Sequence, residues 1–219
     1  MREWLVLPTH GVEPVIDVDE ADLKVLTSHQ VVDGFAAIQG YEPLIDISWD
    51  EARECVEAES RWIQMASAAV DASEFDEILG SAPLEEAGED FDYLFRCNEV
   101  GAAGLVLVLS AAGYATCTSC RGHVGLSHGR VPQVGLGTEP ERLQLLVGYA
   151  GRVGCGVQID GDGIVWVYGR SVADLHSLAK LMLNDRAVFD ALAPAPWRAR
   201  ALEALDYGEE FEWDDDEMD

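Results

Sequence analysis

Residues 98–128 read NEVGAAGLVLVLSAAGYATCTSCRGHVGLSH, and here an apolar run leads directly into a group of chemically capable side chains. The apolar part, Val100–Ala115, contains no charged residue and is shorter than the roughly twenty residues that a transmembrane helix needs. Alanine and glycine are poor strand formers. We therefore predict a helix buried on nearly all sides, and a buried strand through Leu105–Leu109 is the alternative.

The ends of this helix carry recognisable capping residues. We expect Asn98 to cap its start and Glu99 to lie at the positive end of the helix dipole. Gly113 occupies the place of a left-handed C-terminal cap. Gly101 and Gly104 have no side chains, so another backbone could approach the helix closely there.

Downstream of this helix, expected strands and helices alternate regularly. Tyr114–Thr118 and Val131–Leu136 are expected strands, and residues 138–141 (Thr-Glu-Pro-Glu) open a helix with a capping box. Residues 161–163 (Gly-Asp-Gly) join two more strands in a hairpin, and a further helix starts at Ser171. The order α-β-β-α-β-β-α predicts an α+β fold, with a mixed or antiparallel sheet of about four strands and helices on one face.

Residues 1–88 are expected to form an acidic, mainly helical N-terminal part. Its clearest element begins at a capping box, Ser-Trp-Asp-Glu at 48–51, and continues as an amphipathic helix whose apolar side extends to Val70. A stretch with proline and glycine marks the boundary near residue 88. Residues 89–205 should then form the α+β domain, and residues 206–219 a disordered acidic tail. Shorter patterns predict strands at 4–7 and 15–18, and helices at 22–32, 73–79 (stopped by Gly80) and 197–207.

The net charge of −27 is distributed unevenly along the chain. Residues 1–100 carry 24 acidic and 5 basic side chains, residues 101–200 carry 7 and 9, and residues 201–219 carry 10 and none. This excludes a protein that coats DNA, which needs a basic face, and it argues against a nucleic-acid partner. The near-neutral central segment leaves room for a local anion site. Solubility, or an organism with acidic proteins, is the alternative explanation of the charge.

The cysteines and the N-terminus bear on the cellular compartment. Five scattered cysteines do not make a disulfide framework in a chain of this size. The N-terminus lacks the pattern of a signal peptide. We therefore expect a cytoplasmic protein with reduced thiols and no membrane contact.

The loop after the apolar helix has three functional interpretations, of which a zinc site is the first. Zinc in a tetrahedral site takes four cysteine or histidine ligands. Common zinc modules place a longer excursion between the cysteine pair and the histidines. On a strand, Cys117 would also point to the face opposite Cys120. The potential ligands are Cys117, Cys120, His123 and His128, spaced C-x2-C-x2-H-x4-H.

The second interpretation is covalent catalysis by a thiol–imidazole pair. A histidine beside a cysteine stabilises the thiolate and yields a nucleophile, which gives Cys120 and His123 catalytic roles. Arg121 and Arg130 would add a positive field around them.

The third interpretation is a pocket for a small anionic ligand or a nucleotide. Gly122 would let the ligand approach the backbone, where loop N–H groups form an anion-binding nest. The guanidinium groups of Arg121 and Arg130 would hold the anion, and His123 would act as a donor or general acid–base. A polar turn without a ligand is the alternative to all three interpretations. The lining residues would be Ser119, Cys120, Gly122 and His123.

The segment 119–123 resembles a recurring feature of uncharacterised bacterial proteins, in which an apolar Gly/Leu helix leads into Ser-Cys-x-Gly-His. It is more distantly similar to the tRNA wybutosine-synthesis methyltransferase family, in which a Ser-Ser-Cys-Ser-Gly-Arg motif precedes a strand, a helix and another strand. The resemblance implies a mixed α/β fold with a pocket at this motif, but neither S-adenosylmethionine nor tRNA. Ser119, Cys120 and Gly122 match the motif, whereas Thr118, Arg121 and His123 do not.

A different class of function follows from the acidity. The acidic N-terminal helices and the tail would bind a basic protein partner, as an immunity protein, antitoxin or nucleic-acid mimic does, with fast and salt-sensitive association. Glu54, Glu57 and Glu59 would belong to this acidic surface. The central cysteine and histidine would then be structural.

Titratable residues outside the central loop are interpreted as structural or exposed. His10, His29 and His176 are isolated in the sequence. Cys55 and Cys97 are expected to be core residues on helices.

Overall fold

A computed structural model of the chain describes residues 9–35, 42–85, 94–123, 131–208, 211 and 213. The strand expected at 4–7 and most of the acidic tail lie outside these residues.

The described residues form a five-stranded mixed sheet in the order β1-β4-β5-β3-β2. Its antiparallel pairs are β2–β3, β3–β5 and β4–β5, and β1 lies parallel to β4. The parallel edge strand makes the sheet mixed and gives it one strand more than the four in the expected element order. The strands are β1 (Ile16–Asp17), β2 (Ala115–Cys120), β3 (Gln133–Gly137), β4 (Gly156–Ile159) and β5 (Val165–Tyr168).

The predicted α+β class is confirmed, and the order α-β-β-α-β-β-α is found as α5-β2-β3-α6-β4-β5-α7. The turn at 161–163 joins β4 and β5 in an antiparallel hairpin, as expected. The helical elements are η1 (Glu20–Asp22), α1 (Ser28–Asp33), α2 (Trp49–Ala66), α3 (Ala72–Glu85), α5 (Ala103–Ala111), α6 (Pro140–Val153), α7 (Val172–Asn184), α8 (Arg186–Asp190) and α9 (Arg198–Tyr207).

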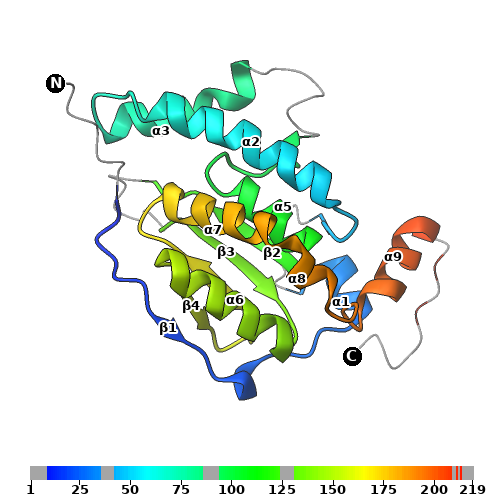
Figure 1. Ribbon diagram of the computed structural model, residues 1–219. Helices are drawn as coiled ribbons and strands as arrows, with labels where there is room; N and C mark the ends of the chain where they lie inside the picture. Colours follow the sequence, from blue (N-terminus) through cyan, green and yellow to red (C-terminus); the bar gives the residue numbers. More distant parts are fainter. Residues whose placement is uncertain are drawn as a thin grey trace.

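Five of the described helices, α2, α3, α5, α6 and α7, form two layers over one face of the sheet (Figure 1). The inner layer contains α5, α6 and α7. The outer layer contains α2, which packs on α5 and α7, and α3, which packs on α2. A single hydrophobic cluster runs from α2 and α3 through α5 to β3 and β5. The expected N-terminal part and the expected α+β domain therefore contribute to the same core.

The apolar run forms a helix, as predicted, but a shorter one. All residues from Ala103 to Ser110 are buried, so the run shows no polar face. Gly113 has the left-handed φ of 87° that its capping role requires. Asn98 does not cap the helix. The N-cap residue is Ala102, and its side chain forms no capping hydrogen bond.

Three other local expectations are wrong for identifiable reasons. Helix α3 continues through Gly80 to Glu85, since one glycine costs a helix only about 1 kcal/mol and Leu79 is anchored in the core. Helix α2 ends at Ala66, so Val70, which was placed on its buried side, is exposed. Residues 22–32 form only the end of η1 and most of α1.

A smaller hydrophobic cluster joins α1 and α9 beside the start of β2. Trp197, which directly precedes α9, and Ala201 of α9 pack there with Val31 of α1. Of the expected tail, residues up to Tyr207 belong to α9. The ring centre of Phe211 lies 4.7 Å from the guanidinium carbon of Arg200. The first part of the tail therefore contacts α9.

Candidate functional site

Strand β2 leads directly into the loop that carries the predicted site. A β-bulge between Thr116 and Thr118 interrupts its register with β3. Cys117 is buried, and Cys120, at the end of the strand, is half-buried. Burial, with a further contribution from the charge of Asp160, raises the pKa of Cys117 to about 12. Cys117 therefore keeps its proton and is poorly suited to bind a metal as a thiolate.

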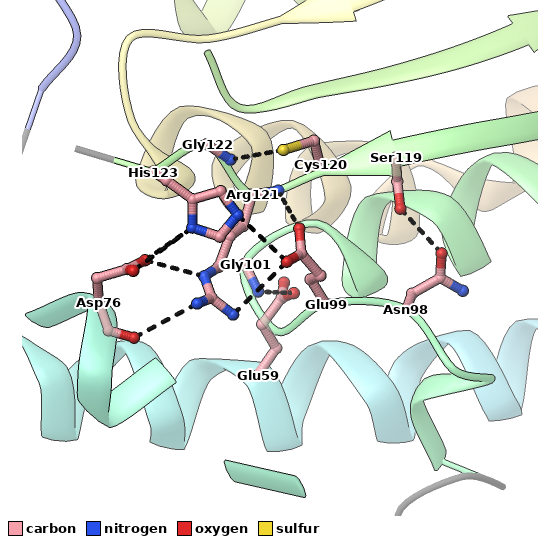
Figure 2. Close-up of polar contacts among 10 residues, drawn as sticks. All are labelled: Glu59, Asp76, Asn98, Glu99, Gly101, Ser119, Cys120, Arg121, Gly122 and His123. Atoms are coloured by element: carbon pink, nitrogen blue, oxygen red, sulfur yellow. Dashed lines mark hydrogen bonds and ion pairs between the residues drawn. The ribbon is translucent and has the colours of Figure 1, made fainter. Parts of the chain in front are cut away.

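The loop residues meet two carboxylates from other parts of the chain (Figure 2). Glu99 comes from the turn before α5 and Asp76 comes from α3. Glu99, Cys120 and His123 each offer one ligand atom, and these three atoms lie within 4.8 Å of one another. Among the described residues, this is the only group of three or more such side chains.

His123 lies between the two carboxylates. Its Nδ1 is 3.3 Å from Asp76 Oδ1, and its Nε2 is 3.4 Å from Glu99 Oε1. One carboxylate can therefore accept a hydrogen bond from a ring N–H and fix the orientation of the ring, which leaves the other nitrogen available as a metal ligand.

Arg121 neutralises part of this acidic cluster. Its Nε donates to Asp76 Oδ1 at 3.2 Å, its backbone N–H donates to Glu99 Oε2 at 3.0 Å, and its Nη1 lies 3.9 Å from Glu99 Oε1. Only 11% of the side chain is exposed. A Cβ at Gly80 would lie 3.2 Å from Arg121 Nη2, so the glycine in α3 gives this guanidinium room. The arginine expected to hold an anion is thus already paired with two carboxylates.

A strained turn positions Glu99. Arg96 and Cys97 have φ angles of 47° and 58°, a region that costs non-glycine residues free energy and is found often at functional sites. Asn98 Nδ2 donates to the carbonyl of Arg96 at 2.9 Å, and Ser119 Oγ donates to Asn98 Oδ1 at 2.9 Å. The turn is thereby tied to β2 beside Cys120. Cys97 is exposed, so its expected place in the core is wrong, whereas Cys55 is buried as expected.

A buried carboxylate supports the same turn from the other side. Glu59 of α2 has no exposed surface. Its Oε1 accepts from the backbone N–H groups of Gly101 and Gly104 at 2.8 and 3.1 Å, so this carboxylate satisfies the start of α5 in place of Asn98. A Cβ at Gly104 would overlap Glu59 Oε2, so a side chain, and not the expected backbone, approaches this glycine closely.

Glu59 cannot belong to an acidic binding surface, because it lies in the core. Its spacing indicates this: it follows Cys55 by four residues and Val56 by three, and therefore shares their buried face. Glu54 and Glu57 are exposed, as expected. The interpretation of Glu59 as a surface residue is wrong.

A small pocket adjoins the cluster. It is lined by His10, Asp76, Arg121 and Gly122, together with Leu79 and Val172. Its volume of about 10 Å³ gives room for about one water molecule. Burial, and to a lesser degree the charge of His123, lowers the pKa of His10. His10 is therefore disfavoured as a cation beside this pocket.

Of the predicted site residues, the structure places the contiguous segment 119–123 together. Arg130 and His128 lie outside the described residues, and Cys117 does not belong to the cluster. No pattern in the sequence predicted a role in the site for Asp76, and Glu99 was expected only at the positive end of the helix dipole. Both lie far along the chain from Cys120, and no local spacing pattern connects them to it.

Comparison with protein-family models, curated proteins and solved structures gives no match. The likeness of residues 119–123 to the wybutosine-synthesis family stays a prediction. None of the described helices has the length and apolarity that crossing a membrane requires.

Proposed function

We propose that this protein binds a divalent metal ion of the zinc type through Glu99, Cys120 and His123, and that the bound ion holds a small anionic ligand. The observation that carries the proposal is the convergence of the three ligand atoms within 4.8 Å. A thiol, an imidazole and a carboxylate are the donors that zinc accepts in proteins.

The spacing of the donor atoms supports the metal. Two ligands at about 2.1 Å from a tetrahedral ion lie roughly 3.4 Å from each other. His123 Nε2 and Glu99 Oε1 are separated by 3.4 Å. These two atoms can therefore take a shared ion with little movement.

The balance of charge also favours a cation. Asp76 and Glu99 carry two negative charges, and Arg121 is the cation that pairs with both. A thiolate at Cys120 would leave the cluster with two net negative charges. An anion entering directly would be repelled, whereas an anion bound to a metal ion would be attracted.

Asp76 would orient the imidazole. With its Nδ1–H directed to Asp76, His123 presents Nε2 to the ion, the arrangement that metal-bound histidines commonly adopt. The N–H of Gly122 lies 3.4 Å from Cys120 Sγ and donates to it. This contact would stabilise the metal-bound thiolate.

Three protein ligands leave the fourth position of a tetrahedral ion open. A water molecule, or one oxygen of a carboxylate or phosphate, fits the space beside the cluster better than a whole nucleotide would. A zinc ion there would polarise such a ligand or activate the water. This would give the loop a chemical role in addition to binding.

Metal titration of the purified, chelator-treated protein tests the proposal. We expect stoichiometric Zn²⁺ binding by calorimetry, and Co²⁺ should give a thiolate-to-metal charge-transfer absorption because Cys120 is a ligand. Cys120→Ser should abolish the charge-transfer band and strongly weaken Zn²⁺ binding. Cys97→Ser is the matched control, since Cys97 is exposed and is not in the cluster, and it should bind as the unmodified protein does. Equal Zn²⁺ affinity in both variants would contradict the proposal.

The second candidate function is recognition of a basic protein partner by the acidic surface. The exposure of Glu54 and Glu57 on α2 supports it. Neutralising these two residues should slow association with such a partner at low salt, and unchanged association rates would count against it.

A further inference from the structure

A second group of polar side chains lies between α2 and α7. Ser60 Oγ is 2.7 Å from His176 Nε2, and His176 Nδ1 is 2.8 Å from Glu59 Oε2. The three residues thus form a chain of hydroxyl, imidazole and carboxylate. This chain uses none of the proposed metal ligands.

The direction of the hydrogen bonds follows from the partners of Glu59. Its Oε1 accepts from two backbone N–H groups, so the side chain acts as a carboxylate acceptor. His176 therefore carries a proton on Nδ1 and donates it to Glu59 Oε2. In the neutral ring Nε2 is then an acceptor, and the Ser60 hydroxyl donates to it.

This order of groups is the one that activates a serine for nucleophilic attack. The base must contact the hydroxyl through one ring nitrogen, and an acid must hold the other nitrogen. Here the acid is further fixed by the start of α5, and His176 is buried. The imidazole is thus held rigidly toward the hydroxyl.

Ser60 keeps access to solvent. Its side chain is half-buried, and the neighbouring residues Arg61 of α2 and Ser177 of α7 are exposed. Ser60 therefore lies near the rim of the contact between the two helices, and its hydrogen bond to His176 is only partly buried.

We propose that Ser60 is an activated nucleophile that accepts an acyl group from a donor with a good leaving group, such as a thioester. Ser60 lies inside α2, where backbone N–H groups are bonded within the helix. These groups are not available to stabilise an oxyanion, so the reaction relies on the reactivity of the donor, and an unactivated amide or alkyl ester would react poorly.

The acyl transfer needs only the three residues and the donor. The Ser60 proton passes to His176 Nε2 as Oγ bonds to the acyl carbon. The carbon–sulfur bond of the thioester then breaks, and the leaving thiolate takes the proton from His176. The products are an ester on Ser60 and a free thiol, and no redox partner is needed.

A fluorophosphonate tests the nucleophile because it forms a stable bond with an activated serine and releases fluoride. We expect the probe to modify Ser60, located by peptide mass spectrometry, and a chelator to leave this reaction unchanged. Ser177 is the internal control. It is exposed and its hydroxyl donates to the Ala173 carbonyl at 2.6 Å, so no base activates it.

Two variants test whether the Ser60 hydroxyl is activated by His176 or is only exposed to the probe. Ser60→Ala should remove the label at this peptide. His176→Asn should slow labelling of Ser60 roughly a hundredfold, since a positioned general base contributes at least that factor. Circular dichroism establishes that each variant is folded. Labelling of Ser60 no faster than that of Ser177 in the unmodified protein would overturn the proposal, and so would unchanged labelling in a folded His176→Asn protein.

Discussion

Two carboxylate–imidazole clusters among the described residues, one at the end of β2 and one between α2 and α7, differ in packing. At the end of β2, His123 meets a carboxylate at each ring nitrogen, at 3.3 and 3.4 Å, and 27% of its side chain is exposed. Between α2 and α7, His176 meets one carboxylate and one hydroxyl at 2.8 and 2.7 Å, and it is buried. The first, which we call the open cluster, has more hydrogen-bond acceptors than donors and suits an added cation. The second, which we call the buried cluster, has its hydrogen bonds satisfied by its own residues.

The two clusters are joined by a few residues of backbone. Glu59 of the buried cluster binds the N–H of Gly101, two residues after Glu99 of the open cluster. A Cβ at Gly101 would lie 3.3 Å from the Cβ of Arg121 and nearer still to Val172. The buried cluster therefore sets the position of the turn that carries a proposed metal ligand.

The largest effect is expected from removing the buried carboxylate. Glu59→Ala would leave His176 and two backbone N–H groups without their acceptor, and we expect a loss of about 3–5 kcal/mol in the free energy of unfolding. Chemical denaturation measures this. Glu57→Ala changes an exposed carboxylate on the same helix and should be nearly neutral. Similar losses in both variants would erase the distinction between the buried cluster and the surface.

The two cysteines of β2 should differ in reactivity. Cys120, in the open cluster, should react faster than Cys117, which is buried. The pKa of Cys117 is raised to about 12, so at pH 8 its thiolate should be roughly a thousandfold scarcer than that of an ordinary thiol. Iodoacetamide should modify Cys120 and exposed Cys97 well before Cys117. Mass spectrometry of the alkylated peptides measures the order. Zn²⁺ should protect Cys120 and leave Cys97 unprotected.

The high pKa of Cys117 also affects stability. A thiol whose pKa is raised in the folded state disfavours the thiolate there, so its contribution is present below the pKa of the unfolded thiol and is lost as the pH rises. The Cys117→Ala variant should therefore lose less of its free energy of unfolding at alkaline pH than the unmodified protein does. An unchanged alkaline transition would show that other groups dominate it.

Much of the fold could be predicted because its signals are local. The capping boxes at Ser48 and Ser171, the hairpin glycines and the hydrophobic spacing all act within a few residues, and the order of elements follows from them. The capping box expected at 138–141 does not form, because the N-cap of α6 is Glu139 and no side chain caps the helix there. The start of α5 was misjudged because its true acceptor, Glu59, lies on another helix. The pairing of β1 with β4 likewise joins residues 141 positions apart (Ile16 and Val157), which no local pattern encodes.

The same limit applies to the candidate site. Residues 119–123 are contiguous and carry reactive groups, so the sequence indicated them. Asp76 reaches them because α3 packs on α2, which in turn packs on α5, and His176 meets Ser60 across 116 positions. Spacing along one helix could still have indicated that Glu59 is buried, so this residue was missed although a signal existed.

An intermediate effect is expected for the residue that orients His123. Asp76→Asn keeps the shape but weakens the contact with His123 Nδ1, and we expect Zn²⁺ affinity to fall roughly 10–100-fold, as for other groups that orient metal ligands. Calorimetric titration measures it. Glu77→Gln is the matched control, because Glu77 neighbours Asp76 on α3 and is exposed. Equal affinities in the two variants would show that Asp76 acts only on Arg121.

The smallest effect separates the two clusters most sharply. Ser60→Ala removes one hydrogen bond from the buried cluster and should cost about 1 kcal/mol of unfolding free energy, because Glu59 still holds His176 and the start of α5. Zn²⁺ affinity should be unchanged, since Ser60 contacts neither the turn nor the loop. A drop in metal affinity in this variant would mean that the two clusters respond as one unit, and the open cluster would then depend on the complete buried chain and not on Glu59 alone.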